Sequence, residues 1–259
     1  MMFRILSGAL LAVTASAAFA ADQTFTGYAR ELDTGRLLYV ESHFVRAAGE
    51  VGEQRVVLYR CANGTETFAR KELDYGTVRE EPQFVLLDGR TGYSEGLRRT
   101  PQGLEVFQRA SATSAMRRAK VPGNIAIVSD AGFDEFVRRH WAELEAGRTV
   151  RFPFMVPSRL DFLTFKVRKH HDQSIEGAPA SVIRLNLSGV LGWFLPYIEV
   201  SYRKSDRVLM RYKGLTNIRD VAGNNFVAQI DFPARERQTV ARVDLAAQKA
   251  VPLVKRCSE

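Results

Sequence analysis

Strand-length apolar segments separated by turn-forming residues recur along most of this chain, and they restrict its fold more than any other feature. Asp33-Thr34-Gly35 separates two such segments, 24–32 and 37–45. At Asn63-Gly64 a two-residue loop is predicted, because these residues tolerate the positive φ angles of a tight hairpin. Further segments of this length lie at 56–62, 65–73, 83–87, 93–98, 104–109, 115–121, 150–156, 160–168, 180–187, 197–203, 207–213 and 225–232. Such spacing predicts a mainly β chain.

One segment departs from the strand pattern and predicts an amphipathic helix at about residues 130–147. Asp130 is placed to cap its N-terminus, and Gly147 is placed to end it in a left-handed conformation. A weaker helical pattern covers residues 235–250. The apolar residues of the main helix share one face: Phe133, Phe136, Val137, Trp141 and Leu144.

Many strands with one strong helix predict an antiparallel sheet curled into a half-barrel or barrel, with the helix packed on the sheet. A doubly wound α/β fold is excluded because it needs a helix between most strands. Residues 21–259 contain no linker or internal repeat, so we expect a single β-rich domain. The inside of such a sheet is either filled with side chains or open to a ligand.

Residues 1–20 are typical of a secretory signal peptide. Arg4 precedes an apolar, alanine-rich stretch, and Ala18-Phe19-Ala20 places small residues where a signal peptidase cleaves. The stretch has about 16 residues, against about 20 for a membrane-spanning helix. An uncleaved membrane anchor is the alternative. We expect an exported chain that begins at Ala21 and has no transmembrane anchor after cleavage.

The two cysteines, Cys61 and Cys257, lack the spacing of a metal site. An even number of cysteines in an exported chain predicts one disulfide, with two free thiols as the alternative. The bridge would close a loop of about 200 residues and would stabilise the fold by up to roughly 5 kcal/mol.

The formal net charge of +8 comes from basic residues that are spread along the chain. A nucleic-acid-binding protein would concentrate such residues in a recognisable module, so we expect no nucleic acid as a partner. An anionic envelope surface could attract a basic exported protein over a long range. An ordinary soluble surface is the alternative.

Gly92-Tyr93-Ser94-Glu95-Gly96 matches the G-x-S-x-G nucleophile elbow of hydrolases. In that motif the serine lies at a sharp turn from a strand into a helix. Pro101 and Gly103 follow too soon for a helix of useful length. We therefore interpret the segment as a hairpin with a chance match.

His170-His171-Asp172 is the densest group of metal-ligand residue types. Neighbouring residues on a strand point to opposite faces, so the two histidines would not share one metal, and no third ligand is evident. Walker A, G-x-G-x-x-G, C-x-x-C and H-E-x-x-H motifs are missing from the sequence. We expect no metal, no cofactor and no catalytic residue.

The most apolar stretch after residue 20 covers residues 187–198 and is too short to span a bilayer. Glycine and proline within it argue against a regular strand or a long helix. We predict that Trp193, Phe194 and Tyr197 contact a ligand at the mouth of the sheet. A buried connection that fills the end of the barrel is the alternative.

A family resemblance is carried by residues 202–220, which include Tyr212-Lys213-Gly214-Leu215-Thr216-Asn217, and by the segment from Asn224-Asn225-Phe226 to Phe232-Pro233. It resembles exported proteobacterial proteins of unknown function, in which a strand hairpin leads into a Tyr-x-Gly-x-Ser/Thr-Asn turn and an Asn-containing strand closes the sheet. More loosely, the whole layout resembles periplasmic half-barrels that carry lipoproteins or lipids. The resemblance implies a bacterial source and a periplasmic location.

Our leading hypothesis is therefore a periplasmic binding or envelope-maintenance protein that holds an apolar or amphiphilic ligand, such as a lipid, inside a curled sheet. One alternative is a hydrolase that uses Ser94, or His170 with Asp172. The other alternative is a non-catalytic protein-interaction module that binds a partner at an edge strand.

Overall fold

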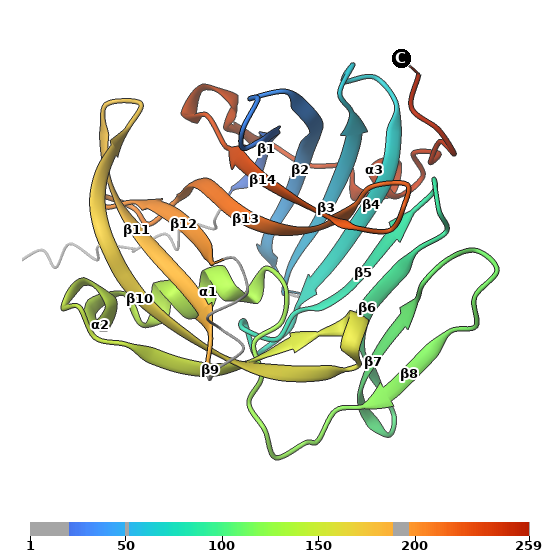
Figure 1. Ribbon diagram of the computed structural model, residues 1–259, viewed down its shortest axis with the longest axis horizontal. Helices are drawn as coiled ribbons and strands as arrows, with labels where there is room; N and C mark the ends of the chain where they lie inside the picture. The colour runs from blue at the N-terminus through green and yellow to red at the C-terminus, as the bar shows by residue number, and fades with distance from the viewer. Residues whose placement is uncertain (1–20, 50–51, 189–196, 259) are drawn as a thin grey trace, which may run out of the picture.

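The computed structural model describes residues 21–49, 52–188 and 197–258, and its main feature is one 15-stranded sheet of antiparallel pairs (Figure 1). The first eight strands are β1 (Asp22–Glu31), β2 (Leu37–Gly49), β3 (Gly52–Cys61), β4 (Thr67–Tyr75), β5 (Gln83–Asp88), β6 (Ser94–Thr100), β7 (Gly103–Arg109) and β8 (Arg117–Lys120). The others are β9 (Val150–Val156), β10 (Asp161–Ile175), β11 (Ala178–Leu187), β12 (Ile198–Arg203), β13 (Leu209–Arg219), β14 (Asn225–Asp231) and β15 (Gln238–Val240). The predicted mainly β fold is confirmed.

Two runs of consecutive hairpins make up this sheet. Strands β1 to β8 pair in sequence order, and so do strands β9 to β14. The runs join where β1 pairs with β14, for example Tyr28 with Asp231. Strands β8 and β9 end the path without pairing to each other, so the curled sheet is a half-barrel that is not closed.

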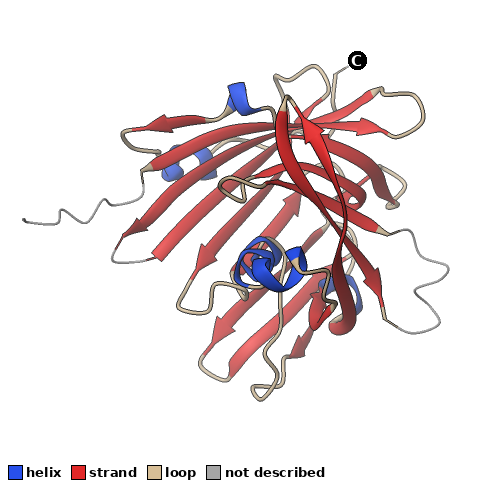
Figure 2. Ribbon diagram, turned by 90° about the vertical axis from the view of Figure 1, so that its left-hand side faces the viewer, coloured by secondary structure: helices blue, strands red, loops and turns tan. Residues whose placement is uncertain are grey.

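Two short helices, α1 (Gly132–Arg139) and α2 (Trp141–Glu145), lie on the concave side of the sheet (Figure 2). All five apolar residues predicted for the helix face are buried in a cluster against β9 to β12. The prediction of one helix over 130–147 is wrong in two details. The helix is interrupted at His140, whose backbone is not helical. Asp130 has a positive φ of 42° and does not cap the helix. Gly147, at φ 76°, follows the end of α2 as predicted.

The start of α1 is fixed by close packing. A Cβ at Gly132 would lie 2.1 Å from the carbonyl oxygen of Glu80. Only glycine allows the helix to approach the loop before β5 this closely. The tight contact at Gly132 therefore sets where α1 begins and how near it lies to this loop.

Two other local predictions are wrong. The loop at Asn63-Gly64 is longer than two residues, because the Cys61 N–H donates to the Glu66 carbonyl across it. Residues 235–250 form, in place of one helix, a short 3-10 turn (Ala234–Glu236), strand β15 and helix α3 (Leu245–Lys249). Pairing of β15 with β1 explains the difference, since tertiary hydrogen bonds override a weak helical pattern.

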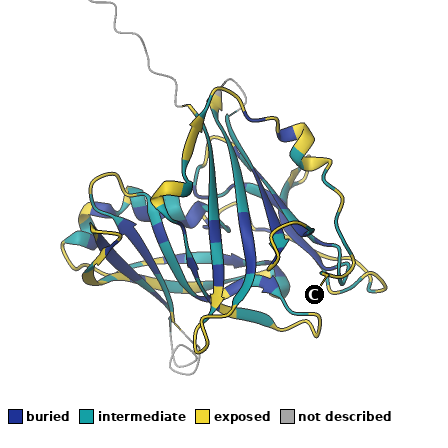
Figure 3. Cartoon of the chain, turned by 90° about the horizontal axis from the view of Figure 1, so that it is seen from above, coloured by how far each residue is buried: buried dark blue, intermediate teal, exposed yellow. Residues whose placement is uncertain are grey.

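The C-terminal segment covers the outer face of β2 and β3. Val243 and Leu245 pack there against Val56 and Leu58 in a separate small core. The predicted disulfide between Cys61 and Cys257 is present, with the two Cα atoms 5.7 Å apart. Buried residues follow the strands, whereas exposed residues gather at the turns (Figure 3).

The predicted signal peptide, and Trp193 and Phe194, lie outside the described residues. Within the described part of the chain, helices with the length and apolar character of a membrane span do not occur.

Candidate functional site

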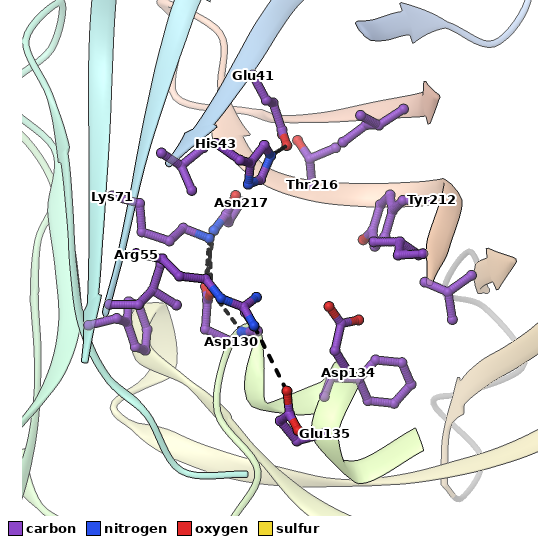
Figure 4. A pocket seen from close by; sticks show the side chains of 18 of the residues that line it. Glu41, His43, Arg55, Lys71, Asp130, Asp134, Glu135, Tyr212, Thr216 and Asn217 are labelled. Atoms are coloured by element: carbon purple, nitrogen blue, oxygen red, sulfur yellow. Dashed lines mark hydrogen bonds and ion pairs between the residues drawn. The ribbon is translucent and has the colours of Figure 1, made fainter. Parts of the chain in front are cut away.

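The concave face of the sheet and helix α1 surround a cavity of about 850 Å³ (Figure 4). Protein sites for small molecules usually measure roughly 300–1,000 Å³. The sequence left open whether the inside of the curled sheet is filled or hollow. This volume shows that it is hollow. The half-barrel has room for a ligand.

The cavity wall differs between its two sides. The side chains that β9 to β12 contribute are apolar: Phe154, Met155, Val156, Phe165, Leu185, Ile198 and Val200. The charged side chains come mainly from β2 to β4, β6 and α1: Glu41, Glu53, Arg55, Lys71, Glu95, Asp134, Glu135 and Arg138. An apolar wall thus faces a charged wall across one cavity.

Lys71 and Asp130 form the most buried ion pair of the charged wall. The Lys71 Nζ lies 2.8 and 3.0 Å from the two carboxylate oxygens of Asp130, and each side chain is 10% exposed. The Asn217 side-chain amide donates to the same carboxylate at 3.3 Å. Asp130 keeps its positive φ because these contacts hold its side chain toward β4 and β13.

A second ionic network joins β3 to helix α1. Arg79 bridges Glu53 at 2.8 Å and Glu135 at 3.1 Å, and Arg138 contacts Glu135 at 2.9 Å. Arg55 also pairs with Glu53. The network fixes α1 over the cavity through partly buried pairs, which solvent screens less than surface pairs.

His43 and Glu41 form a hydrogen-bonded pair on β2. The His43 Nε2 lies 2.8 Å from a Glu41 carboxylate oxygen, so this nitrogen carries the donated proton. The His43 ring stacks on Phe25 at 4.2 Å. Burial lowers the pKa of His43, which keeps the imidazole neutral at neutral pH.

Glu95 on β6 extends the charged wall toward the β5–β6 turn. The Tyr93 hydroxyl donates to its carboxylate at 2.5 Å. Burial is the largest influence on Glu95 and raises its pKa. Arg219 lies over the Tyr93 ring at 4.4 Å and donates to the Gly223 carbonyl.

Ser94 lies in strand β6 and not at a strand-to-helix turn, so the geometry of a nucleophile elbow is missing. Its hydroxyl is buried and makes no hydrogen bond to the described part of the chain. The glycines of the motif have other roles. Gly92 has a positive φ of 73° in the β5–β6 turn, and a Cβ at Gly96 would lie 2.1 Å from the Phe84 carbonyl oxygen.

His170 and Asp172 lie on β10 and do not line the cavity. Asp172 contacts Lys169 at 2.8 Å and Lys204 at 2.6 Å. Hydrogen bonds from these lysines lower the pKa of Asp172 to about 2, which makes its carboxylate a weak base. Among the described residues, no three metal-ligand side chains gather in a way that could hold an ion.

Tyr197, the described member of the predicted ligand-contact group, is 41% exposed just before β12. The Arg184 guanidinium lies over its ring at 4.1 Å. Tyr197 does not line the cavity, whereas the next residue, Ile198, does.

Sequence reasoning missed the charged wall. The sequence pattern that could have indicated it lies in β2 and β3. There, two polar pairs are spaced by two residues: Glu41 with His43, and Glu53 with Arg55. Residues spaced by two share a face of a strand. Such pairs are usually expected on a solvent-facing side, whereas here they line the cavity.

The sequence matches no protein-family model and no curated protein. Two solved structures are similar to the chain over most of its length. One is a β-barrel-like protein of the domain of unknown function DUF1849 from Brucella abortus, with 7% identity and a TM-score of 0.45, covering 83% of this chain and 98% of that one. The other is a DUF1329 family protein from Desulfovibrio piger, with 10% identity and a TM-score of 0.34, covering 91% of this chain and 93% of that one.

Proposed function

We propose that the chain is a periplasmic binding protein that holds an amphiphilic molecule, such as a lipid, in the cavity of its half-barrel. The division of the cavity into an apolar and a charged wall carries this proposal. Apolar chains gain about 25 cal/mol for each Å² removed from water, so β9 to β12 offer a favourable surface to such a chain. The charged wall offers partners to a polar headgroup.

The proposed location rests on the N-terminal sequence and on the disulfide. Residues 1–20 have the layout of a secretory signal, and bonds such as Cys61–Cys257 persist in oxidising compartments. Expression of the full gene in a Gram-negative host, followed by cell fractionation, tests this. We expect the protein in the periplasmic fraction with Ala21 as its first residue; a cytoplasmic protein that retains Met1 would contradict export.

The binding proposal is tested by native mass spectrometry and by titration with a detergent-sized probe, dodecanol, after removal of bound lipid. Val200 lines the apolar wall, so Val200→Trp should fill part of the cavity and weaken binding at least about tenfold, equivalent to about 1.4 kcal/mol. Val227, on β14, is 39% exposed and does not line the cavity, so Val227→Trp is the matched control. Equal binding by both variants, or failure of the parent chain to bind, would contradict the proposal.

The geometry gives less support to a hydrolase. Ser94 is buried without a hydrogen-bonded base among the described residues, and Asp172 is held by two lysines outside the cavity. Nucleophilic catalysis requires the nucleophile and its base within hydrogen-bond reach. Neither group meets this requirement.

A further inference from the structure

Arg237 differs from the other charged residues of the cavity in its position. It follows the short turn Ala234–Glu236 after β14 and is half-buried. Its side chain lines the main cavity and also a neighbouring pocket of about 220 Å³, which Arg203 and Met210 line as well. Arg237 therefore lies where the two spaces adjoin.

Contacts with β1 hold this side chain in place. The Arg237 guanidinium lies over the Phe25 ring at 4.1 Å, and Phe25 in turn stacks on His43. Its Nη1 donates to the Gln23 side-chain oxygen at 3.4 Å. A guanidinium has five N–H donors, so most of its hydrogen-bonding capacity is unused by these contacts.

Arg237 also lacks an ionic partner among the described residues. Within residues 21–49, 52–188 and 197–258, no carboxylate oxygen lies within 4.0 Å of it, whereas Arg55, Lys71, Arg79 and Arg138 each pair with a carboxylate. Arg219, also on the cavity wall, donates to the Gly223 carbonyl at 2.9 Å and to the Tyr93 hydroxyl. A partly buried cation without a counter-charge is unfavourable, and a bound anion would relieve this cost.

The surroundings increase the attraction for an anion. Burial and the nearby cations Arg203 and Arg138 lower the pKa of Arg237. Guanidinium remains protonated at neutral pH even so, because its ordinary pKa is far above 7. The same positive potential that opposes its proton favours a negatively charged group beside it.

We propose that Arg237 binds the anionic headgroup of the amphiphile, a carboxylate or phosphate monoester, while the apolar chain lies along β9 to β12. Leu209 connects the two regions, since it lines both spaces and packs against the apolar cluster between α1 and β9 to β12. The fork of N–H donors in arginine suits both headgroups. This inference rests on the proposed binding function and specifies its ligand class.

Calorimetric titration with dodecyl probes of one chain length tests the inference. The probes are dodecanoate and dodecyl phosphate, each below its micelle concentration at pH 8, and neutral dodecanol below its solubility limit. The parent chain should bind the two anions about 10- to 100-fold more tightly than dodecanol, since hydrogen bonds to charged groups are stronger than neutral ones. Arg237→Gln should abolish this preference, with dodecanol affinity unchanged, and Arg237→Lys should retain part of it.

Arg235→Gln is the matched control, because it removes the same charge from a side chain that is 78% exposed two residues away. It should keep the full preference. An equal affinity for dodecanoate and dodecanol, or an unchanged preference in Arg237→Gln, overturns the inference while dodecanol binding still supports the binding function. Failure of every dodecyl probe to bind overturns both. Inorganic phosphate that binds as tightly as dodecyl phosphate also overturns the inference, since the dodecyl chain would then contribute nothing to binding.

Discussion

Removal of Lys71 should destabilise the protein strongly, because it leaves the Asp130 carboxylate buried without a cation. Both side chains are 10% exposed, and Lys71 contacts both oxygens of Asp130. Loss of one partner of a buried pair costs about 3–5 kcal/mol. We expect about 3 kcal/mol for Lys71→Met, at the lower end, since the pair borders the cavity and Asn217 still donates to Asp130.

The assay is urea unfolding at pH 7, with the midpoint and the slope measured for Lys71→Met, Asp130→Asn and the double variant. The double variant should recover a large part of the loss, because it replaces both charges by uncharged groups. A coupling free energy of about 1.5–3 kcal/mol is expected from such a contact. Unchanged slopes would show that the differences come from the folded state.

Arg36→Met is the control, since Arg36 is 66% exposed in its pair with Glu31. Exposed pairs contribute little to stability, so its unfolding midpoint should match that of the parent chain. The reasoning fails if Lys71→Met lowers stability by less than about 1 kcal/mol, or if the two single changes add without coupling.

Three further predictions concern pH and the disulfide. Glu95→Gln should gain stability relative to the parent as the pH rises above 4.5. Burial raises the pKa of Glu95, so the folded parent retains a proton that the unfolded chain releases. An equal change in the unfolding free energy of both proteins between pH 5 and pH 8, measured with urea, would contradict this. His43→Gln should lose less stability than the parent as the pH falls below 6.5. Because burial lowers the pKa of His43, the folded parent stays unprotonated where the unfolded chain takes up a proton. Thermal unfolding across this range measures how stability changes with pH, and an equal loss in both proteins would refute the reasoning. The double variant Cys61→Ala/Cys257→Ala should lose up to about 5 kcal/mol of stability. Carboxypeptidase should digest its C-terminal tail faster than that of the parent. Equal resistance would show that the contacts of residues 251–258 hold the tail without the disulfide.

Most strand positions were predictable because turn signals separate these strands in the sequence. Asp33-Thr34-Gly35 forms the β1–β2 turn, and the residues around Lys204-Ser205-Asp206 join β12 to β13 as expected. The disulfide followed from the even number of cysteines in a chain that was expected to be exported. These features depend on local backbone preferences, or on a count, and neither requires knowledge of distant contacts.

Other features depended on contacts between segments far apart in the sequence. Asp130 has the residue type of a helix cap, yet its carboxylate contacts Lys71, which lies 59 residues earlier. The β1–β15 pairing replaced the helix expected near residue 240. The G-x-S-x-G match arose because a turn needs Gly92 and close packing needs Gly96, not because of any property of Ser94.

The charged wall also explains why the half-barrel stays hollow. An inward-facing strand surface made only of apolar residues would be expected to collapse onto helix α1, because interiors pack closely. Long charged side chains instead meet between β3 and α1: Arg55 lies 3.9 Å from Glu135, and Arg79 bridges Glu53 and Glu135. Charges that are paired across a space cannot be removed singly without a large cost. From the sequence alone, these charged residues would be expected on the solvent-exposed surface. In the structure their ionic network maintains the cavity on which the proposed function depends.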